Sequence, residues 1–152
     1  MGDRSFLDWP FFEPRHRGLA AALEAWCEGH LPVSHGDVDA ACKGLVAALG
    51  AGGWLKHSGA GEGERLDVRS LCLIRETLAR HDGLADFAFA MQGLGMGAVS
   101  LFGTAAQREW LEKTRAGKAI SGFALTEPGS GSDVAATATT ANATKVAMFG
   151  LT

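Results

Sequence analysis

The sequence predicts a mainly α-helical fold followed by the first strand of an incomplete β-rich domain. Between residues 15 and 117, apolar side chains recur at spacings of three and four, which is the period of an amphipathic helix. From residue 119 the stretch "AISGFALT" alternates loosely instead, as a strand does. With 152 residues and 47% hydrophobic side chains, the chain is long enough to bury a core.

The first half of the chain is expected to hold an extended lead-in and three helices. "FLDWPFFEP" at residues 6–14 contains two prolines and reads as an extended segment. The helical period then runs from residue 15 to about residue 30. Asp37 and Asp67 are good N-cap residues, and an apolar stripe follows each of them. These two residues therefore mark the starts of the second and third helices.

Two or three further helices are expected before the strand. Residues 83–103 are apolar nearly all round, which is typical of a central helix rather than a surface helix. "TAAQ" at residues 104–107 is a capping box, so another helix should begin there and run to Gly117. A strand that starts at residue 119 has no partner in the remaining sequence. Residues 119–152 are therefore expected to begin a second domain that is incomplete.

Composition excludes several classes of function. The net charge of −3 and the pI near 5.9 do not suggest nucleic acid or an anionic membrane as a partner. No apolar run approaches the roughly 18 residues of a membrane span. The histidines and cysteines form no metal-binding motif. No signal peptide is recognised, so Cys27, Cys42 and Cys72 are expected to be reduced core residues of a cytoplasmic protein.

The stretch "ALTEPGSGSDVAA" at residues 124–136 is the best candidate for binding chemistry. Thr126 offers a hydroxyl beside the predicted strand end, and Pro128 stiffens the corner. The glycines that follow allow close backbone approach and a positive φ, so that successive N–H groups can form an anion nest. Serine hydroxyls alternate with these glycines, in the order Gly129, Ser130, Gly131, Ser132. These features suit a large, planar anion, or equally a tight hairpin turn.

The same stretch is similar to the flavin-binding signature of the acyl-CoA dehydrogenase family and matches it at every restricted position. The upstream sequence "LCLIRETLARHDGLADFAFAMQGLGMGAVSLFGT" resembles the paired helices that precede this signature. The resemblance implies an N-terminal α-helical domain over residues 1–118 and the start of a middle β-domain over residues 119–152. The family's C-terminal four-helix bundle has no counterpart in this sequence.

The resemblance implies oxidation of the Cα–Cβ bond of an acyl-CoA thioester, with FAD as cofactor. Phe123, Leu125 and Thr126 would lie along the flavin, with Thr126 bonding its pyrimidine end. Gly131 and Ser132 would contact the pyrophosphate, and Ser132 would also reach the CoA thioester.

Other residues of the resemblance have more than one interpretation. Phe87, Ala90 and Met91 could border the acyl chain, or they could be plain core residues of the long apolar helix. Glu127 and Asp133 are expected to hold the turn rather than to catalyse. No metal ligand is implied.

The sequence departs from the family after residue 140, where "ANATKVAMFGLT" does not match the usual pattern. The catalytic glutamate of the family lies in the absent C-terminal domain, so no catalytic residue is assigned. The chain is therefore expected to be a truncated N-terminal portion that is inactive alone and forms the family's homo-oligomers only with the missing domains. An acyl-CoA oxidase or flavin monooxygenase branch of the same fold, and a non-enzymatic truncated product, stay open.

Overall fold

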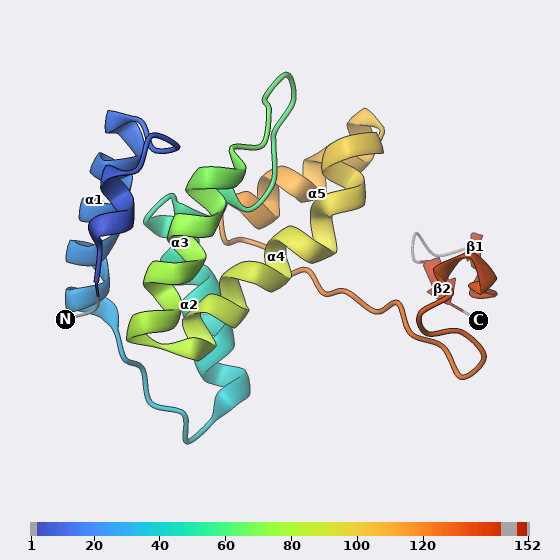
Figure 1. Ribbon diagram of the computed structural model, residues 1–152. Coiled ribbons are helices and arrows are strands. Elements are labelled where there is room, and N and C mark those ends of the chain that lie inside the picture. The colour runs from blue at the N-terminus through green and yellow to red at the C-terminus, as the bar shows by residue number, and fades with distance from the viewer. Residues whose placement is uncertain (1–2, 144–148, 152) are drawn as a thin grey trace. The chain divides into compact units, whose positions relative to one another are not determined.

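The computed structural model describes residues 3–143 and 149–151. The chain divides into two compact units, Met1–Gly122 and Phe123–Thr152. We call the first the helical unit and the second the C-terminal unit. Figure 1 shows the helices and strands of the two units.

The helical unit consists of helices joined by short connections, which confirms the predicted mainly α fold. Helix α4 contacts α2, α3 and α5, while α1 packs against α3 (Figure 1). The elements, in chain order, are η1 (Ser5–Asp8), α1 (Pro14–His30), α2 (Val38–Ala51), η2 (Trp54–His57), α3 (Val68–His81), α4 (Gly83–Phe102) and α5 (Ala105–Arg115).

The predicted helix starts are those found. The Asp37 side chain accepts from the N–H of Ala40 at 3.0 Å, and that of Asp67 caps α3 in the same way. At α5, Thr104 and Gln107 form the reciprocal capping box. The lead-in differs from the expectation, because residues 5–8 form a turn of 3-10 helix instead of an extended segment.

The hydrophobic core is formed where α1, α2, α3 and α4 meet. Leu23, Leu49, Ile74, Leu78 and Phe89 are among its fully buried side chains.

The cysteines do not all belong to this core. Cys27 is buried, whereas Cys42 is only half-buried and Cys72 is exposed. The expectation of three core cysteines is therefore right for Cys27 alone, because the helical period does not tell which face of a helix meets the core. Burial raises the pKa of the Cys27 thiol to about 11, so it stays protonated at neutral pH.

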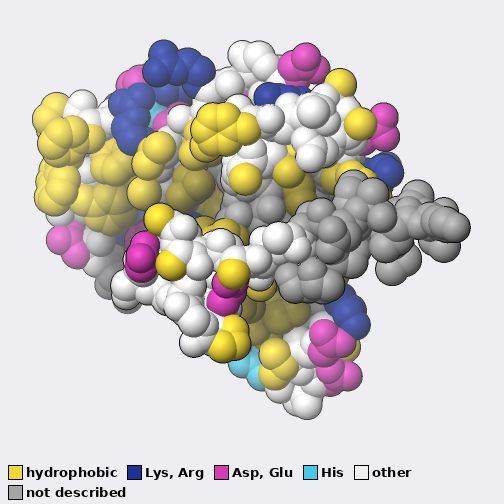
Figure 2. Space-filling model, turned by 90° about the vertical axis from the view of Figure 1, so that its right-hand side faces the viewer, with side chains coloured by type: hydrophobic (Ala, Val, Ile, Leu, Met, Phe, Trp, Pro, Cys, Tyr) yellow, Lys and Arg dark blue, Asp and Glu magenta, His cyan; other side chains and the backbone are white. Residues whose placement is uncertain are grey.

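Helix α4 is less central than its composition predicts. One side is buried, with Phe89 and Gln92 at the core. Large hydrophobic side chains on its other side are exposed, namely Phe87, Leu94, Leu101 and Phe102. Hydrophobic side chains are visible on the face of the molecule shown in Figure 2. By length and composition alone, α4 could also cross a membrane, contrary to the sequence expectation.

The C-terminal unit contains little regular structure in its described residues. The predicted strand over residues 119–126 is absent, because no neighbouring strand pairs with it. An isolated bridge joins Glu127 and Ser130, and η3 (Val134–Ala136) follows. Strand β1 (Ala141–Ala143) pairs antiparallel with β2 (Phe149–Leu151). Residues 144–148 and 152, part of the stretch that departs from the family, lie outside the described residues.

Candidate functional site

The predicted flavin-binding stretch is built around a closed turn. The N–H of Glu127 donates to the carbonyl of Ser130 at 2.8 Å, and the N–H of Ser130 donates back at 3.2 Å. Ser130 is 7% exposed, and its hydroxyl donates to the backbone carbonyl of Asp133 at 2.7 Å. The Ser130 hydroxyl therefore shapes the turn and is not a free phosphate donor, contrary to the sequence interpretation.

Glu127 ties this turn to the residues that follow it. Its carboxylate accepts from the N–H groups of Ala138 and Thr139, each at 2.8 Å. These two backbone donors, Ala138 foremost, lower the pKa of Glu127, so the carboxylate stays charged at neutral pH. A carboxylate fully engaged with backbone donors holds a conformation and is poorly suited to accept a substrate proton. This is the role that the sequence predicts for it.

Exposed donors without a protein partner flank the turn in the sequence. Thr126, Gly131 and Ser132 are exposed. Within the described residues, the N–H groups of Gly131 and Ser132 and both hydroxyls donate to no protein acceptor. An added Cβ at Gly131 would meet no atom within 4 Å, so its backbone is open to a ligand. Such donors are what an anionic group requires.

The glycines do not adopt the conformation that the sequence allowed. Positive φ angles occur among the described glycines at Gly53, Gly63 and Gly117, and not at Gly129 or Gly131. The alternating right- and left-handed form of the anion nest is therefore not made, and the donors are presented from an ordinary turn. A ligand phosphate would have to use the exposed N–H groups in that geometry.

An apolar edge precedes these donors. Phe123 is 51% exposed and Leu125 is 42% exposed, with the Thr126 hydroxyl next along the chain. Exposed apolar side chains can pack against a planar ring while neighbouring hydrogen-bond donors bond its polar edge. The residues of this stretch thus fit a flavin dinucleotide: an apolar edge for the ring and open N–H groups for the phosphates.

The residues predicted to border an acyl chain lie on α4, in the helical unit. Phe87 is 55% exposed, whereas Ala90 and Met91 are half-buried. Spacings of three and four residues place all three on one helix face. Ala90 also lines an apolar cavity of about 270 Å³ between α3 and α4. The three residues are thus not plain core, and their role toward an acyl chain stays a prediction.

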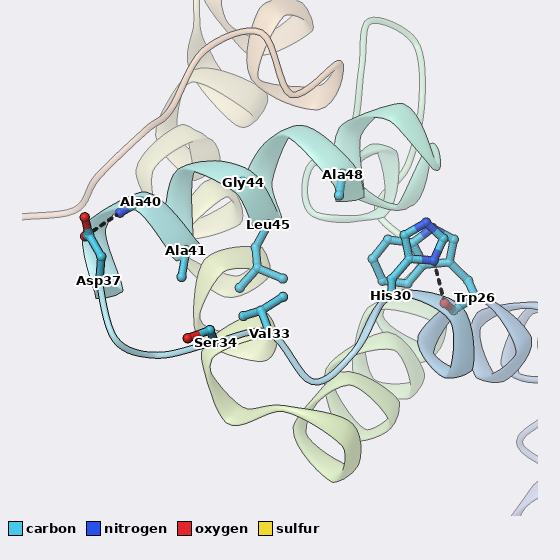
Figure 3. Close-up of a pocket in the computed structure, with 10 residues that line it drawn as sticks. All are labelled: Trp26, His30, Val33, Ser34, Asp37, Ala40, Ala41, Gly44, Leu45 and Ala48. Atoms are coloured by element: carbon cyan, nitrogen blue, oxygen red, sulfur yellow. Dashed lines mark hydrogen bonds between the residues drawn. The ribbon is translucent and has the colours of Figure 1, made fainter.

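Sequence reasoning missed a groove between the end of α1 and helix α2. Its volume is about 340 Å³. The rings of Trp26 and His30 stack at one end with centroids 4.2 Å apart, and Asp37 lies at the other end (Figure 3). The aromatic pair at i and i+4 is the signal that could have revealed it. Its polar groups serve the fold, because His30 Nδ1 donates to the Trp26 carbonyl and Asp37 caps α2.

The strongly acidic carboxyls of the helical unit also serve the fold. A hydrogen bond from Arg80, with help from His81, lowers the pKa of Glu24 to about 2. Burial opposes the ionisation of Asp67, but hydrogen bonds from His16 and Ser70 lower its pKa to about 2. A general base needs a pKa near the working pH, which neither carboxyl has.

A comparison with known families decides what the helical unit is. Residues 13–118 match the family model described as "Acyl-CoA dehydrogenase, N-terminal domain". The chain belongs to the acyl-CoA dehydrogenase family. The resemblance seen in the sequence is thereby confirmed, and helices α1 to α5 all fall within the matched residues.

Relatives within the acyl-CoA dehydrogenase family are very long-chain specific mitochondrial enzymes by name. The protein of Mus musculus is 44% identical over 64 residues, which is 41% of this chain and 10% of that protein. The protein of Homo sapiens is 43% identical over 68 residues, 43% of this chain and 10% of that protein. The protein of Bos taurus is 51% identical over 47 residues, 30% of this chain and 7% of that protein. The chain thus spans about a tenth of the length of the curated relatives it matches.

Proposed function

We propose that this chain forms the N-terminal part of an FAD-dependent enzyme that oxidises the Cα–Cβ bond of an acyl-CoA thioester. The observation that supports this most is the pair of exposed, unpaired N–H groups at Gly131 and Ser132, in a stretch that follows a helical domain of the family. The names of the matched relatives favour a dehydrogenase over the oxidase and monooxygenase branches.

In this proposal the exposed residues of the C-terminal unit hold the cofactor. Phe123 and Leu125 support the ring, and the Thr126 hydroxyl bonds its pyrimidine end. The N–H groups of Gly131 and Ser132, together with the Ser132 hydroxyl, bind the pyrophosphate, and Ser132 also reaches the CoA thioester. The bound FAD supplies the acceptor for the hydride that leaves the β-carbon.

The helical unit contributes the acyl-chain border in this proposal, through Phe87, Ala90 and Met91 of α4. No base for the α-proton is assigned among the described residues. We therefore propose that the chain by itself binds FAD weakly and does not turn over. Assembly into a homo-oligomer would require the further domains of the family, and the cytoplasmic location stays a prediction.

Titration of the 152-residue chain with FAD tests the cofactor assignment. We expect weak binding, with an affinity lowered several-fold by Ser132→Ala. Ser34→Ala is the matched control, because this exposed serine lies in the other unit. Equal affinities for the two variants would contradict the assignment of Ser132.

Anaerobic mixing of the FAD-loaded chain with acyl-CoAs of different lengths tests its activity. We expect the visible absorption of the flavin to stay that of the oxidised form. Bleaching by any acyl-CoA would show that the chain turns over and would overturn the proposal that it is inactive alone.

A further inference from the structure

We propose that Gln92 and Gly95 are positioning residues for the flavin-binding stretch. They dock Ser121 onto α4 and so fix the point at which residues 123–126 leave the helical unit. The docking itself is read from contacts within the helical unit. Its consequence for cofactor binding rests on the proposed function.

Gln92 supplies a buried hydrogen-bond acceptor for residues 116–122, the connection that follows α5. It is 2% exposed in the middle of α4. Its Nε2 donates to the carbonyl of Ala88 at 3.0 Å, which directs Oε1 toward the connection. Oε1 accepts from the backbone N–H of Ser121 at 2.9 Å. The side-chain amide thus bridges its own helix and the segment that follows α5.

Ser121 completes the contact in the opposite direction. Its hydroxyl donates to the backbone carbonyl of Gln92 at 3.1 Å. Ser121 is 8% exposed, so both hydrogen bonds lie away from water. A buried hydrogen bond is costly to break because the groups left behind lose their partners. The two hydrogen bonds between Gln92 and Ser121, which we call the lock, therefore hold Ser121 against α4 together.

Gly95 provides the space for this lock. A Cβ at residue 95 would lie 2.7 Å from the carbonyl oxygen of Gly122 and 2.7 Å from the Ser121 side chain. Any larger residue would push the connection off the helix. Gly97, two residues along α4, offers a contrast, because a Cβ there would meet nothing within 4 Å.

The pattern of exposure shows that this contact is not ordinary core packing. Ile120 is 58% exposed and Phe123 is 51% exposed, while the polar Ser121 between them is buried. Packing alone would bury the apolar neighbours and expose the serine. A chain residue spans at most about 3.6 Å, so Phe123 starts within roughly 7 Å of the lock. The lock therefore limits where the flavin-binding stretch begins.

Amide hydrogen exchange on the 152-residue chain tests the inference with two variants and one matched control. Gln92→Leu removes the acceptor while keeping the size, and Gly95→Ala introduces the clash. Gly97→Ala makes the same chemical change as Gly95→Ala where space is open. We expect exchange at Ser121 to rise about tenfold or more in the first two variants and to stay unchanged in the control, because the lock opens locally.

A second readout separates positioning from simple stability. At a temperature where circular dichroism shows all variants folded, FAD titrations should give an affinity weakened about threefold or more for Gln92→Leu and Gly95→Ala, and unchanged for Gly97→Ala. Both readouts moving together would support the inference.

Each contrary result has its own meaning. Unchanged exchange at Ser121 in both variants would overturn the docking. Faster exchange with unchanged FAD affinity would overturn the positioning role. If the unmodified chain does not bind FAD, the proposed function fails for this chain. Limited proteolysis by chymotrypsin after Phe123 then decides the inference, because cleavage requires the neighbouring segment to open locally. Cleavage should be faster in the two variants than in Gly97→Ala, and equal rates would overturn the inference.

Discussion

The helical unit and residues 123–140 differ in how many of their side chains are buried. In the helical unit, Leu23, Ile74 and Phe89 are almost fully buried in a shared core. Over residues 123–140, Ser130 is the one buried residue, and the rest are half-buried or exposed. The turn around Ser130 keeps its shape through the backbone bonds between Glu127 and Ser130 and the bond from the Ser130 hydroxyl to the Asp133 carbonyl. The Glu127 carboxylate joins this turn to the residues that follow it. One region is held by packing and the other by local polar contacts.

This difference explains how stability and ligand access divide along the chain. Apolar burial is the main favourable term in folding, and the helical unit has most of it. A stretch whose N–H groups are to bind phosphate cannot bury them in its own structure. The proposed flavin-binding stretch therefore gains little stability from its side chains and depends on the contacts of Gln92 and Glu127.

The largest effect should come from the core. Phe89→Ala should lower the free energy of unfolding by about 3–5 kcal/mol, because it leaves a cavity in the packed interior. Phe87→Ala, two residues away on the exposed side of the same helix, should change it by about 0.5 kcal/mol or less. Urea denaturation followed by circular dichroism measures both. Similar losses for the two variants would contradict the assignment of the buried side of α4.

The ion-pair cluster at Glu24 should have the next largest effect. Glu24 bonds Arg4, Arg80 and His81, and Glu24→Gln should cost about 1–2 kcal/mol at pH 7. Glu28→Gln, one turn further along α1, is the matched control. The difference from the unmodified chain is read from urea denaturation.

The Glu24 effect should depend on pH in a defined direction. Its pKa in the folded chain is about 2, below its ordinary value of 4.5. Between these values the unfolded chain binds more protons, so stability falls as the pH falls. The deficit of Glu24→Gln should be complete above pH 4.5 and shrink as the pH falls toward 2. A deficit that grows on acidification would contradict the depressed pKa.

The capping box of α5 should give a smaller effect. Thr104→Ala removes the side-chain oxygen that accepts from the N–H of Gln107, and should cost about 1 kcal/mol. Thr104→Ser keeps that oxygen and should retain most of the stability. Thermal denaturation of both variants measures the difference, and equal melting temperatures would show that the cap does not contribute.

The smallest effect on global stability should come from Glu127. Glu127→Gln should leave the unfolding of the helical unit unchanged, because the contacts described for Glu127 lie within the C-terminal unit. Amide exchange at Ala138 and Thr139 should nevertheless become about threefold faster or more, since a neutral amide accepts more weakly. Asp133→Asn is the control. A loss of helical-unit stability would erase the contrast between the two regions.

Most of the helical architecture could be predicted from local sequence signals. Asp37, Asp67 and the Thr104 capping box each mark a helix start because they act on backbone groups a few residues away. The signature at residues 124–136 indicates the family from residue types alone, since these types are needed at fixed spacing.

Features that depend on distant partners could not be predicted. The strand over residues 119–126 is absent because strand formation requires a neighbour, which an alternating pattern cannot guarantee. Cys42 and Cys72 lie outside the core because the helical period leaves the orientation of each face open. The Ser130 hydroxyl, predicted to be a phosphate donor, instead stabilises the turn by donating to the Asp133 carbonyl.

The sequence by itself determined the helices, their caps and the family, because these follow from local periodicity and short-range hydrogen bonding. The tertiary structure alone decided that Gln92 meets Ser121 across 29 residues, that Gly95 makes room for this contact, and which side of α4 is buried. The physical reason is that burial and hydrogen-bond satisfaction between distant segments depend on how helices pack, and the chain's local pattern does not encode the partner.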